Sequence, residues 1–300
     1  MNGENTGSSK KIITHSGNFH ADEVFACAAL SILFGGKVEI VRSRDSALWG
    51  QSDLVVDVGG IYNEDSDRFD HHQEGGAGVR ENGIPYASFG LVWKRYGETL
   101  AGSAHASRAI DERLVQSIDA GDNGVETYTK REEVSPYLIN DVVASFRPVW
   151  NEGRTIDEGF FEALSVAKKI LEREIVFSRA EEEGTARVLE AYDRAEDKRI
   201  IILDDHYPWY RALGNLAEPL YVVKPDRGNG NKWKIEAVRD DTHSFKNRKD
   251  LPVSWAGKRD ENLAHVSGVS DAIFCHNKRF IAVAGSQDGA IKLAKIAVEA

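Results

Sequence analysis

Apolar residues in the first part of the chain form short runs that alternate with a longer amphipathic stretch. Residues 11–15, 38–42 and 53–60 are β-rich runs, and the last is apolar on both faces, as buried parallel strands are. Residues 21–34 have the length and composition of a helix, which ends at a pair of glycines. Strands that alternate with helices predict a parallel sheet that binds its ligands at the carboxyl ends of the strands.

Helical patterns dominate the middle of the chain and strands return after it. Helices are predicted at 87–97, 104–118 and 135–145, followed by one long helical stretch at 157–195 with a candidate break near Gly184. From Arg199 the pattern is rich in strands and ends in a helix at 287–299. We therefore predict an α/β protein with four parts: a disordered tail at 1–10, a parallel-sheet catalytic domain at 11–150, a helical connector at 151–197, and a smaller α/β substrate-binding domain at 198–300.

Composition indicates the cellular compartment in which the protein is expected. No apolar run approaches the roughly 20 residues of a membrane helix, and the polar N-terminus does not resemble a signal peptide. Cys27 and Cys275 lie too far apart in sequence to form a disulfide framework. We expect a cytoplasmic protein without a membrane partner.

Charge is distributed unevenly. The net charge of −10 argues against a protein that coats long nucleic-acid duplexes. Residues 224–259, however, carry ten basic and five acidic residues, interleaved with Trp233, Phe245 and Trp255. A basic, aromatic segment on an acidic body suits a short anionic ligand, although a solvated strand-and-loop face is an equal alternative.

Candidate metal ligands gather at the ends of the predicted elements. The segment HSGNFHADE places His15, His20 and Asp22 where a strand passes into a helix. Asp57 closes a buried strand, Asp70–Gln73 (DHHQ) follows another strand-like stretch, and Asp119 precedes a glycine turn. Each fragment alone reads as a cap, a turn or a solvated loop. Together, histidines and carboxylates without a cysteine pair favour two divalent ions such as Mn²⁺ or Mg²⁺ over structural zinc.

These motifs resemble those of a known superfamily. The H-x₄-H-x-D opening, the later aspartates and DHH resemble the DHH phosphoesterases. More closely, HSGNFHADEVFACAAL, VVDVGG, RFDHHQ, IDAGDNG, LPVSWAGKR and FCHNKRFIAVAGSQDGAI resemble the melanocyte-proliferating-gene family over nearly the whole chain. The resemblance implies an N-terminal DHH-like domain and a metal-dependent hydrolase, and that family is associated with 3′–5′ RNA exonuclease activity.

Roles are carried over from the resemblance position by position. It implies two divalent ions, with Mn²⁺ favoured and Mg²⁺ or Zn²⁺ as alternatives, and these ligands: His15, His20, Asp22, Asp57, His71 and Asp119. Asp57 is expected to bridge the ions. Asp70 and His72 are expected to be catalytic, with His72 facing the phosphate or the leaving group. His20 replaces a carboxylate of the superfamily. The GGGH-type segment by which many relatives hold substrate is missing.

Substrate contacts are expected in the C-terminal domain, at Trp255, Gly257, Lys258, Arg259 and His276. An exposed turn explains the loop 255–259 equally well. The leading hypothesis is a nuclease that acts on short single-stranded RNA or other oligonucleotides. The alternatives are a small-molecule phosphohydrolase acting on pyrophosphate, a nucleotide or a cyclic dinucleotide, and a non-catalytic metal- or RNA-binding protein. The sequence leaves the oligomeric state open, with a homodimer as one option.

Overall fold

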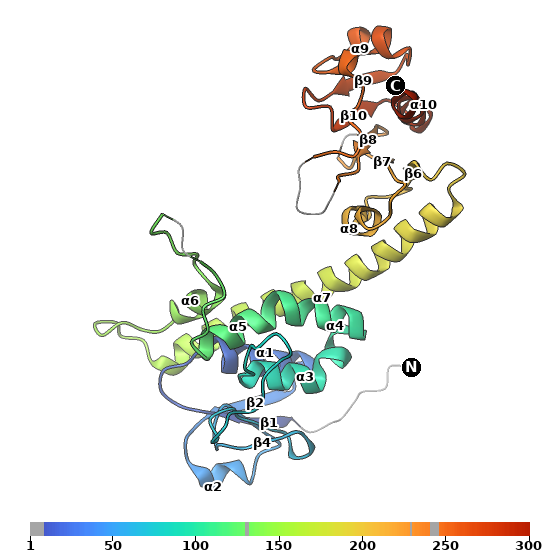
Figure 1. The fold of residues 1–300 in the computed structure, drawn as a ribbon. Helices are drawn as coiled ribbons and strands as arrows, with labels where there is room; N and C mark the ends of the chain where they lie inside the picture. The colour runs from blue at the N-terminus through green and yellow to red at the C-terminus, as the bar shows by residue number, and fades with distance from the viewer. Residues whose placement is uncertain (1–8, 130–131, 229, 241–245) are drawn as a thin grey trace, which may run out of the picture. The chain divides into compact units, whose positions relative to one another are not determined.

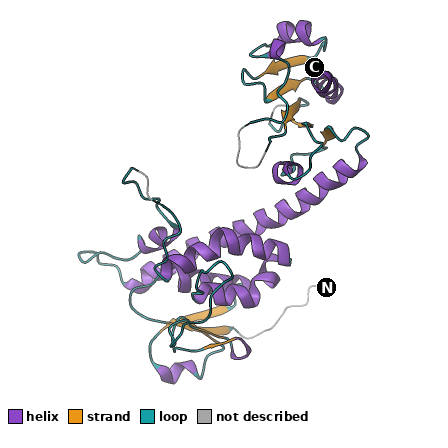
Figure 2. Cartoon of the chain, viewed as in Figure 1, coloured by secondary structure: helices purple, strands orange, loops and turns teal. Residues whose placement is uncertain are grey.

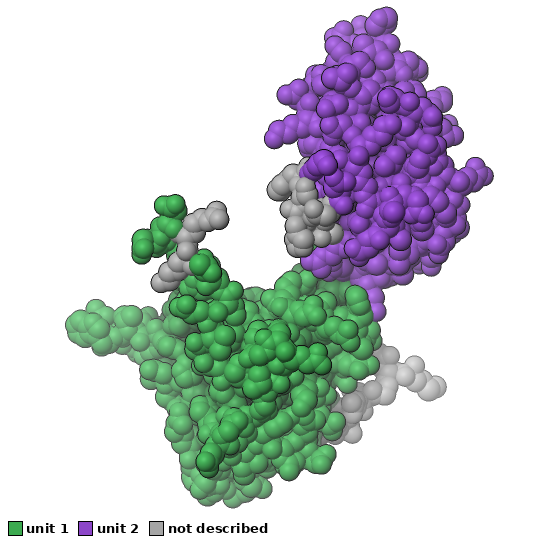
Figure 3. Space-filling model, in the orientation of Figure 1, with its two compact units in different colours: residues 1–179 green, residues 180–300 purple. Residues whose placement is uncertain are grey.

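A computed structural model describes four stretches of the chain (Figure 1): residues 9–129, 132–228, 230–240 and 246–300. The chain divides into two compact units, residues 1–179 and 180–300 (Figure 3). Most of the expected tail, residues 1–8, lies outside the described residues, as does Phe245 of the basic segment. Lys10, the last residue assigned to that tail, is the first residue of strand β1 (Lys10–Thr14).

The first unit is built on a sheet with strand order β2-β1-β3-β5-β4. Strand β1 pairs in parallel with β2 (Val38–Arg42) and β3 (Leu54–Val56), and β3 pairs in parallel with β5 (Arg68–Phe69). The edge strand β4 (Tyr62–Asn63) is antiparallel to β5. The carboxyl ends of four neighbouring strands therefore share one edge of the sheet.

Helices cover one face of this sheet and a smaller element covers the other (Figures 1 and 2). The main core joins α1 (Ala21–Leu33) and α3 (Ser88–Ala101) to one face of the sheet through side chains such as Ile12. Ile13 points the opposite way, towards α2 (Ser46–Trp49). Helix α1 is buried from Ala21 to Ser31. Because no face of this stretch meets water, acidic residues near its start are buried too.

A π-helical turn interrupts the helix that was expected at 104–118. Helix α4 (Ala104–Ile110) passes through a π turn, Asp111–Val115, into α5 (Gln116–Asp122). A π turn adds one residue to a helical turn, so the residues after it face a different direction from that given by a period of 3.6. The helix runs on to Asp122, past the glycine that was read as its end. The next helix, α6, spans Ile139–Ala144.

Helix α7 (Ile156–Arg194) is continuous over 39 residues. The expected break near Gly184 is absent from this helix. A Cβ atom at position 184 would overlap the Cδ atom of Pro208. The glycine therefore permits close approach of a neighbouring segment, which is a packing reason rather than a helix-breaking one.

The second unit has a mixed sheet with strand order β6-β7-β8-β10-β9. Strand β6 (Ile200–Ile202) is parallel to β7 (Tyr221–Pro225). The pairs that follow are antiparallel and involve β8 (Trp233–Ala237), β10 (Ile281–Ala284) and β9 (Ala272–Cys275). The part of the chain after Arg199 that was predicted to be rich in strands holds all the strands of this sheet, and the α/β fold class is confirmed.

Both faces of this second sheet carry helices. Helix α10 (Gln287–Glu299) packs on the face that holds Tyr221. Helix α8 (Trp209–Gly214) and Val188 of α7 pack on the face that holds Val222. The sequence pattern predicted neither the short 3₁₀ turn at Val253–Trp255 nor helix α9 (Asp260–Ser267). Within the described residues, no helix is long and apolar enough to span a membrane.

Candidate metal centre

Parallel strands of the first unit end in residues that can bind metal. His15 follows β1, Asp57 follows β3, and His71 lies two residues beyond β5. His15 Nε2 is 3.2 Å from Asp57 Oδ2, and His71 Nε2 is 3.4 Å from Asp57 Oδ1. The shared edge of the sheet thus brings these three distant positions together, as expected.

The start of α1 adds His20, Asp22 and Glu23. The backbone N–H of His20 donates to both carboxylate oxygens of Glu23, at 2.8 Å each, in a capping arrangement. Glu23 Oε1 also lies 3.0 Å from His15 Nε2, and Asp22 Oδ2 lies 3.8 Å from His71 Nε2. Both carboxylates are fully buried. The helix start therefore supplies charged side chains to the same cluster.

Three groups of candidate ligands occur among the described residues, each with its ligand atoms within 4.8 Å of one another: His15, His20, Glu23 and Asp57; Asp57, His71 and His72; His20, Asp22 and Asp122. Asp57 belongs to two groups, and so does His20. Sharing of a carboxylate between groups is the arrangement of a two-ion site. Sequence reasoning missed Glu23 and Asp122. For Glu23 a local signal exists, because it stands three residues after the N-cap.

Asp57 is held firmly in place. Its backbone has φ +56°, in the left-handed region that residues other than glycine seldom adopt. The Oγ of Ser88 donates a hydrogen bond of 2.9 Å to Asp57 Oδ1, and the backbone N–H of Ser88 donates to Asp22 Oδ2 at 3.3 Å. Ser88, which the sequence did not single out, thus fixes two carboxylates of the cluster from the start of α3.

Histidines and carboxylates of the cluster shift one another's pKa values. Burial alone lowers the pKa of His15, but hydrogen bonds to Asp57 and Glu23 outweigh it and raise that pKa to about 10. For His71, hydrogen bonds to Asp122 and Asp57 likewise outweigh burial and raise the pKa to about 10. Burial and the neighbouring carboxylates raise the pKa of Asp22. Burial opposes the charge of Asp57 as well, yet His15 and His71 hold the pKa of Asp57 below its usual value.

The donor set fits divalent cations. Among the described residues, Asp22 Oδ1 is buried without a hydrogen-bond partner, and His71 Nε2 is surrounded by carboxylate oxygens of Asp22, Asp57 and Asp122. Buried polar atoms without partners are rare, and each calls for an explanation such as an ion. Imidazole nitrogens mixed with carboxylate oxygens, without thiolates, match Mn²⁺, Mg²⁺ or Zn²⁺. The residues present can therefore hold the ions that the motif resemblance implies.

Asp119 does not join any of the three groups within the described residues, contrary to expectation. Its carboxylate instead forms an ion pair of 2.8 Å with Arg80 and accepts a 3.0 Å hydrogen bond from the backbone N–H of Gly90. A Cβ atom at position 90 would overlap Asp119 Oδ2. Asp122, one turn later on α5, lies 3.2 Å from His71 Nε2 and belongs to one of the three groups.

Asp70 and His72 form a pair at the rim of the cluster. Asp70 Oδ1 lies 2.7 Å from His72 Nδ1 and also accepts from the backbone N–H of His72. The other oxygen of Asp70 accepts from the N–H of Gly60 at 2.6 Å. Asp70 is buried, whereas the side chain of His72 is 61% exposed. A buried carboxylate thus orients an imidazole that remains open to a substrate.

A cavity of about 380 Å³ adjoins the cluster. Its lining includes His15, Asp57 and His72, together with Arg44 and Trp49, which sequence reasoning missed. Arg44 lies just after β2, so a fourth parallel strand also delivers a side chain to this edge. The Arg44 guanidinium lies 3.2 Å from Ser16 O and from His15 Nδ1, and no carboxylate of the described residues pairs with it.

The substrate contacts expected in the second unit are only partly suited to that role. Trp255 is 1% exposed and belongs to the hydrophobic core, so its ring cannot stack on a base, and that expectation is wrong. Gly257 has φ +70° in the turn that leads to Lys258 and Arg259, and the Arg259 guanidinium lies over the ring of Phe274.

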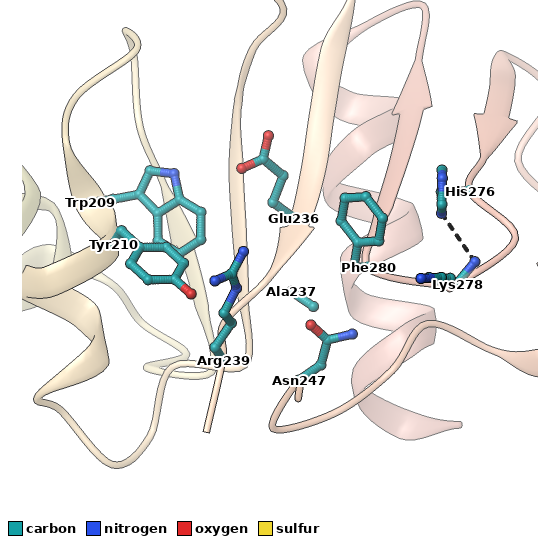
Figure 4. A pocket seen from close by; sticks show the side chains of 9 residues that line it. All are labelled: Trp209, Tyr210, Glu236, Ala237, Arg239, Asn247, His276, Lys278 and Phe280. Carbon is teal, nitrogen blue, oxygen red and sulfur yellow. Dashed lines mark hydrogen bonds between the residues drawn. The ribbon is translucent and has the colours of Figure 1, made fainter. Parts of the chain in front are cut away.

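His276 lies elsewhere, in a hollow of about 690 Å³ whose lining does not include the 255–259 turn (Figure 4). This hollow belongs entirely to the second unit. The five expected contacts are therefore not gathered at one site.

Comparison with known proteins identifies the family. The family model MYG1_exonuc, described as an uncharacterised protein family (UPF0160), matches residues 11–298. A MYG1 protein of Schizosaccharomyces pombe is 32% identical, over 96% of this chain and 97% of its own length. Proteins named MYG1 exonuclease from Mus musculus and Homo sapiens are 31% and 30% identical, each over 95% of this chain and over 84% and 85% of their own length. The resemblance to the melanocyte-proliferating-gene (MYG1) family is confirmed, and the chain belongs to the MYG1 family.

Proposed function

We propose that the chain is a metal-dependent phosphodiesterase that removes nucleotides from the 3′ end of short single-stranded RNA or related oligonucleotides. The observation that carries the proposal is Asp57, whose two oxygens face different groups of candidate ligands. The names of the mouse and human relatives support the exonuclease activity. The direction and the preference for RNA rest on the motif resemblance.

The ligand groups suggest where two ions belong. His15, His20, Glu23 and Asp57 would hold one of them. Around His71, carboxylate oxygens of Asp22, Asp57 and Asp122 lie within 3.8 Å of Nε2, and these residues would hold the other. When bound, a pair of divalent ions supplies an acidified water and neutralises charge on the phosphoryl group. We propose Mn²⁺, with Mg²⁺ and Zn²⁺ as alternatives.

The remaining chemistry belongs to side chains at the rim. Asp70 accepts from Nδ1 of His72, which orients the ring and leaves Nε2 to pass a proton to the departing oxygen. Arg44 faces the cavity without a carboxylate partner among the described residues, and its planar guanidinium suits two phosphoryl oxygens at once. Arg44 therefore binds the phosphate, and His72 acts on its leaving group.

We prefer an oligonucleotide over pyrophosphate as the substrate because aromatic side chains of the second unit can stack on a base. Trp255 no longer supports base stacking because it is buried. Aromatic side chains do line the hollow around His276, and bases stack on such rings whereas pyrophosphate cannot. Aromatic support for a nucleotide substrate therefore moves from Trp255 to this hollow.

Turnover of a substrate panel tests the proposal. The metal-stripped protein would be assayed with Mn²⁺, Mg²⁺, Zn²⁺ or chelator on 5′- and 3′-labelled RNA and DNA oligomers, pyrophosphate and cyclic dinucleotides. We expect 5′-labelled RNA to shorten stepwise, since that label reports loss from the 3′ end, and chelator to stop the reaction. Asp57→Asn is the control for contaminating nucleases. Exclusive turnover of pyrophosphate or a cyclic dinucleotide would contradict the nuclease assignment.

A further inference from the structure

The hollow in the second unit is a second candidate ligand site. It measures about 690 Å³ and lies among α8, the end of β8 and the β9–β10 turn. In Figure 4, Trp209 and Tyr210 stand on one side, and Phe280, His276 and Lys278 on the other. Glu236, Arg239 and Asn247 lie between them (Figure 4). None of these residues belongs to the metal centre.

Flat side chains form both walls. The Arg239 guanidinium stacks over the ring of Tyr210, 4.6 Å from its centroid. On the opposite wall, Phe280 is 41% exposed and packs against His276 with a centroid distance of 4.5 Å. Large exposed rings in a hollow are typical of sites that stack a planar ligand. The ligand should therefore carry an aromatic ring.

The charges and polar atoms suggest what else the ligand carries. Lys278 is exposed, and no carboxylate of the described residues lies within ion-pair distance of it, so its ammonium can bind an anion. The one carboxylate in the lining, Glu236, already pairs with Lys224 at 3.0 Å. The Asn247 amide donates one hydrogen bond to Asp250, and its amide oxygen can accept from a donor such as an exocyclic amino group. A ring, an amino group and an anion together describe a nucleotide.

The Tyr210 hydroxyl is a separate sign of a missing ligand. It is buried and has no hydrogen-bond partner among the described residues. In Figure 4 it points towards the side of the hollow where Arg239 lies. A buried hydroxyl without a partner destabilises a protein unless a ligand or water satisfies it.

We propose that this hollow binds one nucleotide, with its base stacked on Phe280 and its phosphate bound by Lys278. The base lies between the Phe280 wall and the wall formed by Tyr210 and Arg239. The same chemistry is offered by a free mononucleotide and by one nucleotide of an RNA chain. The hollow belongs to the second unit and the metal centre to the first, so binding of a mononucleotide can be measured without hydrolysis. A role for the hollow in holding the substrate rests on the proposed function.

Calorimetric titration of the full-length protein with AMP in chelator tests the site without turnover. Adenosine and ribose 5-phosphate, which lack the phosphate or the base, should each bind more weakly than AMP. Phe280→Ala should weaken AMP binding about 5- to 150-fold, the range for loss of one base stack. Lys278→Ala should weaken AMP but leave adenosine unchanged. Tyr210→Phe should weaken AMP while raising the melting temperature of the free protein, because it removes an unsatisfied hydroxyl.

Matched controls separate this site from general effects. Lys292→Ala removes an exposed cation of α10, and Trp150→Ala removes a ring that is 96% exposed in the first unit. Both variants should bind AMP like the wild type. All variants should also hydrolyse bis(p-nitrophenyl) phosphate with Mn²⁺ at the wild-type rate, since that substrate carries no base. If the wild type does not hydrolyse this substrate, the result counts against the proposed function and not against this site.

Two ligand series complete the test. If affinity rises from AMP to short oligoadenylates and Phe280→Ala weakens both, the site holds a nucleotide of an RNA chain. If AMP binds and the oligomers do not, it holds a free nucleotide. The proposal is overturned if the wild type binds ribose 5-phosphate as tightly as AMP, or if Phe280→Ala and Lys278→Ala both bind AMP with unchanged affinity.

Discussion

Asp57 has a strained backbone, and its two carboxylate oxygens contact His15 and His71. A left-handed conformation costs a residue other than glycine free energy, and the surrounding structure must enforce it. Here Ser88, His15 and His71 all contact the carboxylate, so its position is fixed from several sides. Such strain at the end of a strand directs the side chain to the point where both ligand groups need it.

Replacing Asp57 by asparagine should abolish turnover without disturbing the backbone. Asparagine tolerates the left-handed region about as well as aspartate, but its neutral amide cannot bind two cations. The metal-free variant should also melt at a lower temperature, because the lowered pKa of Asp57 reports stabilising contacts with His15 and His71. Activity above about a tenth of wild type, a barrier change of only about 1.4 kcal/mol, would be incompatible with a bridging role.

Arg44 should matter for phosphate binding. Arg44→Ala should lower kcat/KM about 10- to 100-fold, since a charge-assisted hydrogen bond contributes about 1.5–3 kcal/mol. Arg44→Lys should recover only part of this loss because lysine lacks the planar fork. Arg108→Ala on α4 changes the charge of an exposed position equally and serves as the control. Equal kinetics for the two alanine variants would remove Arg44 from the site.

Metal binding should release protons. With pKa values of about 10, His15 and His71 are protonated at pH 7.5 in the metal-free protein, whereas metal ligation requires neutral imidazole. Titration of Mn²⁺ in buffers of different ionisation enthalpy should show about two protons released when both ions bind. Metal affinity should therefore rise with pH.

The same pKa values set the pH dependence of the metal-free fold. A pKa raised in the folded state stabilises it fully below the unfolded value of about 6.5, and this contribution disappears as pH rises towards 10. The melting temperature of the metal-free protein should fall over that range. A flat profile together with no proton release would contradict the protonated state of these imidazoles.

Among the elements, the helix that runs through α4 and α5 shows where sequence reasoning fails. Its apolar pattern predicts a helix correctly, but no periodicity reveals a π turn, which rotates the residues beyond it. Gly121 was read as the end of the helix, although α5 continues to Asp122. We therefore propose Asp122, one turn later, as the ligand in place of Asp119.

Substitutions on α5 should distinguish the structural role of Asp119 from the metal-binding role of Asp122. Asp119→Ala should lower stability by about 1–3 kcal/mol, because it removes one of the two carboxylate partners of Arg80 and leaves only Asp111. Asp122→Ala should lower the stability of the metal-free protein only modestly, because His71 keeps Asp57 as a partner, and should weaken Mn²⁺ binding at least tenfold. Melting temperature and Mn²⁺ titration of both variants check this. A stable Asp119→Ala protein that cannot bind metal would restore the original assignment.

The strands were predicted more reliably than the side-chain environments. Parallel strands repeat an apolar run followed by polar residues, so the meeting of His15, Asp57 and His71 follows from topology alone. Trp255 is buried in a core that is assembled from distant segments, including β8 and α10, and a local pattern cannot show this. The helix break predicted near Gly184 was wrong for a similar reason, because only the structure shows that Pro208 packs beside this glycine.

For the molecule as a whole, each unit has a core of its own. The main core of the first unit contains no residue beyond Ile175, and the largest core of the second begins at Ile200. The metal centre and the nucleotide hollow lie in different units. Ligands of the two sites should therefore stabilise different parts of the chain.

Scanning calorimetry should resolve these effects. Mn²⁺ at about 100 times its Kd stabilises its unit by about 2.7 kcal/mol, which should shift the transition of the first unit by about 5–10 °C. AMP should shift the transition of the second unit and leave the first in place. The two transitions can be assigned with Asp57→Asn and Phe280→Ala, each of which should remove one shift. A single transition that both ligands move equally would show that the units unfold together.

Because Gly90 and Asp119 are in contact, substitutions at these two positions depend on one another during evolution. A side chain at position 90 has no room while the carboxylate of Asp119 points at the same backbone. Alanine could be accepted at position 90 only after Asp119 had been replaced by a residue with a shorter side chain. In the reverse order, the alanine Cβ atom would clash with the Asp119 carboxylate. Substitutions at the two sites are thus ordered in time. A lineage that keeps the Arg80–Asp119 pair is committed to glycine at 90, 29 residues earlier in the chain.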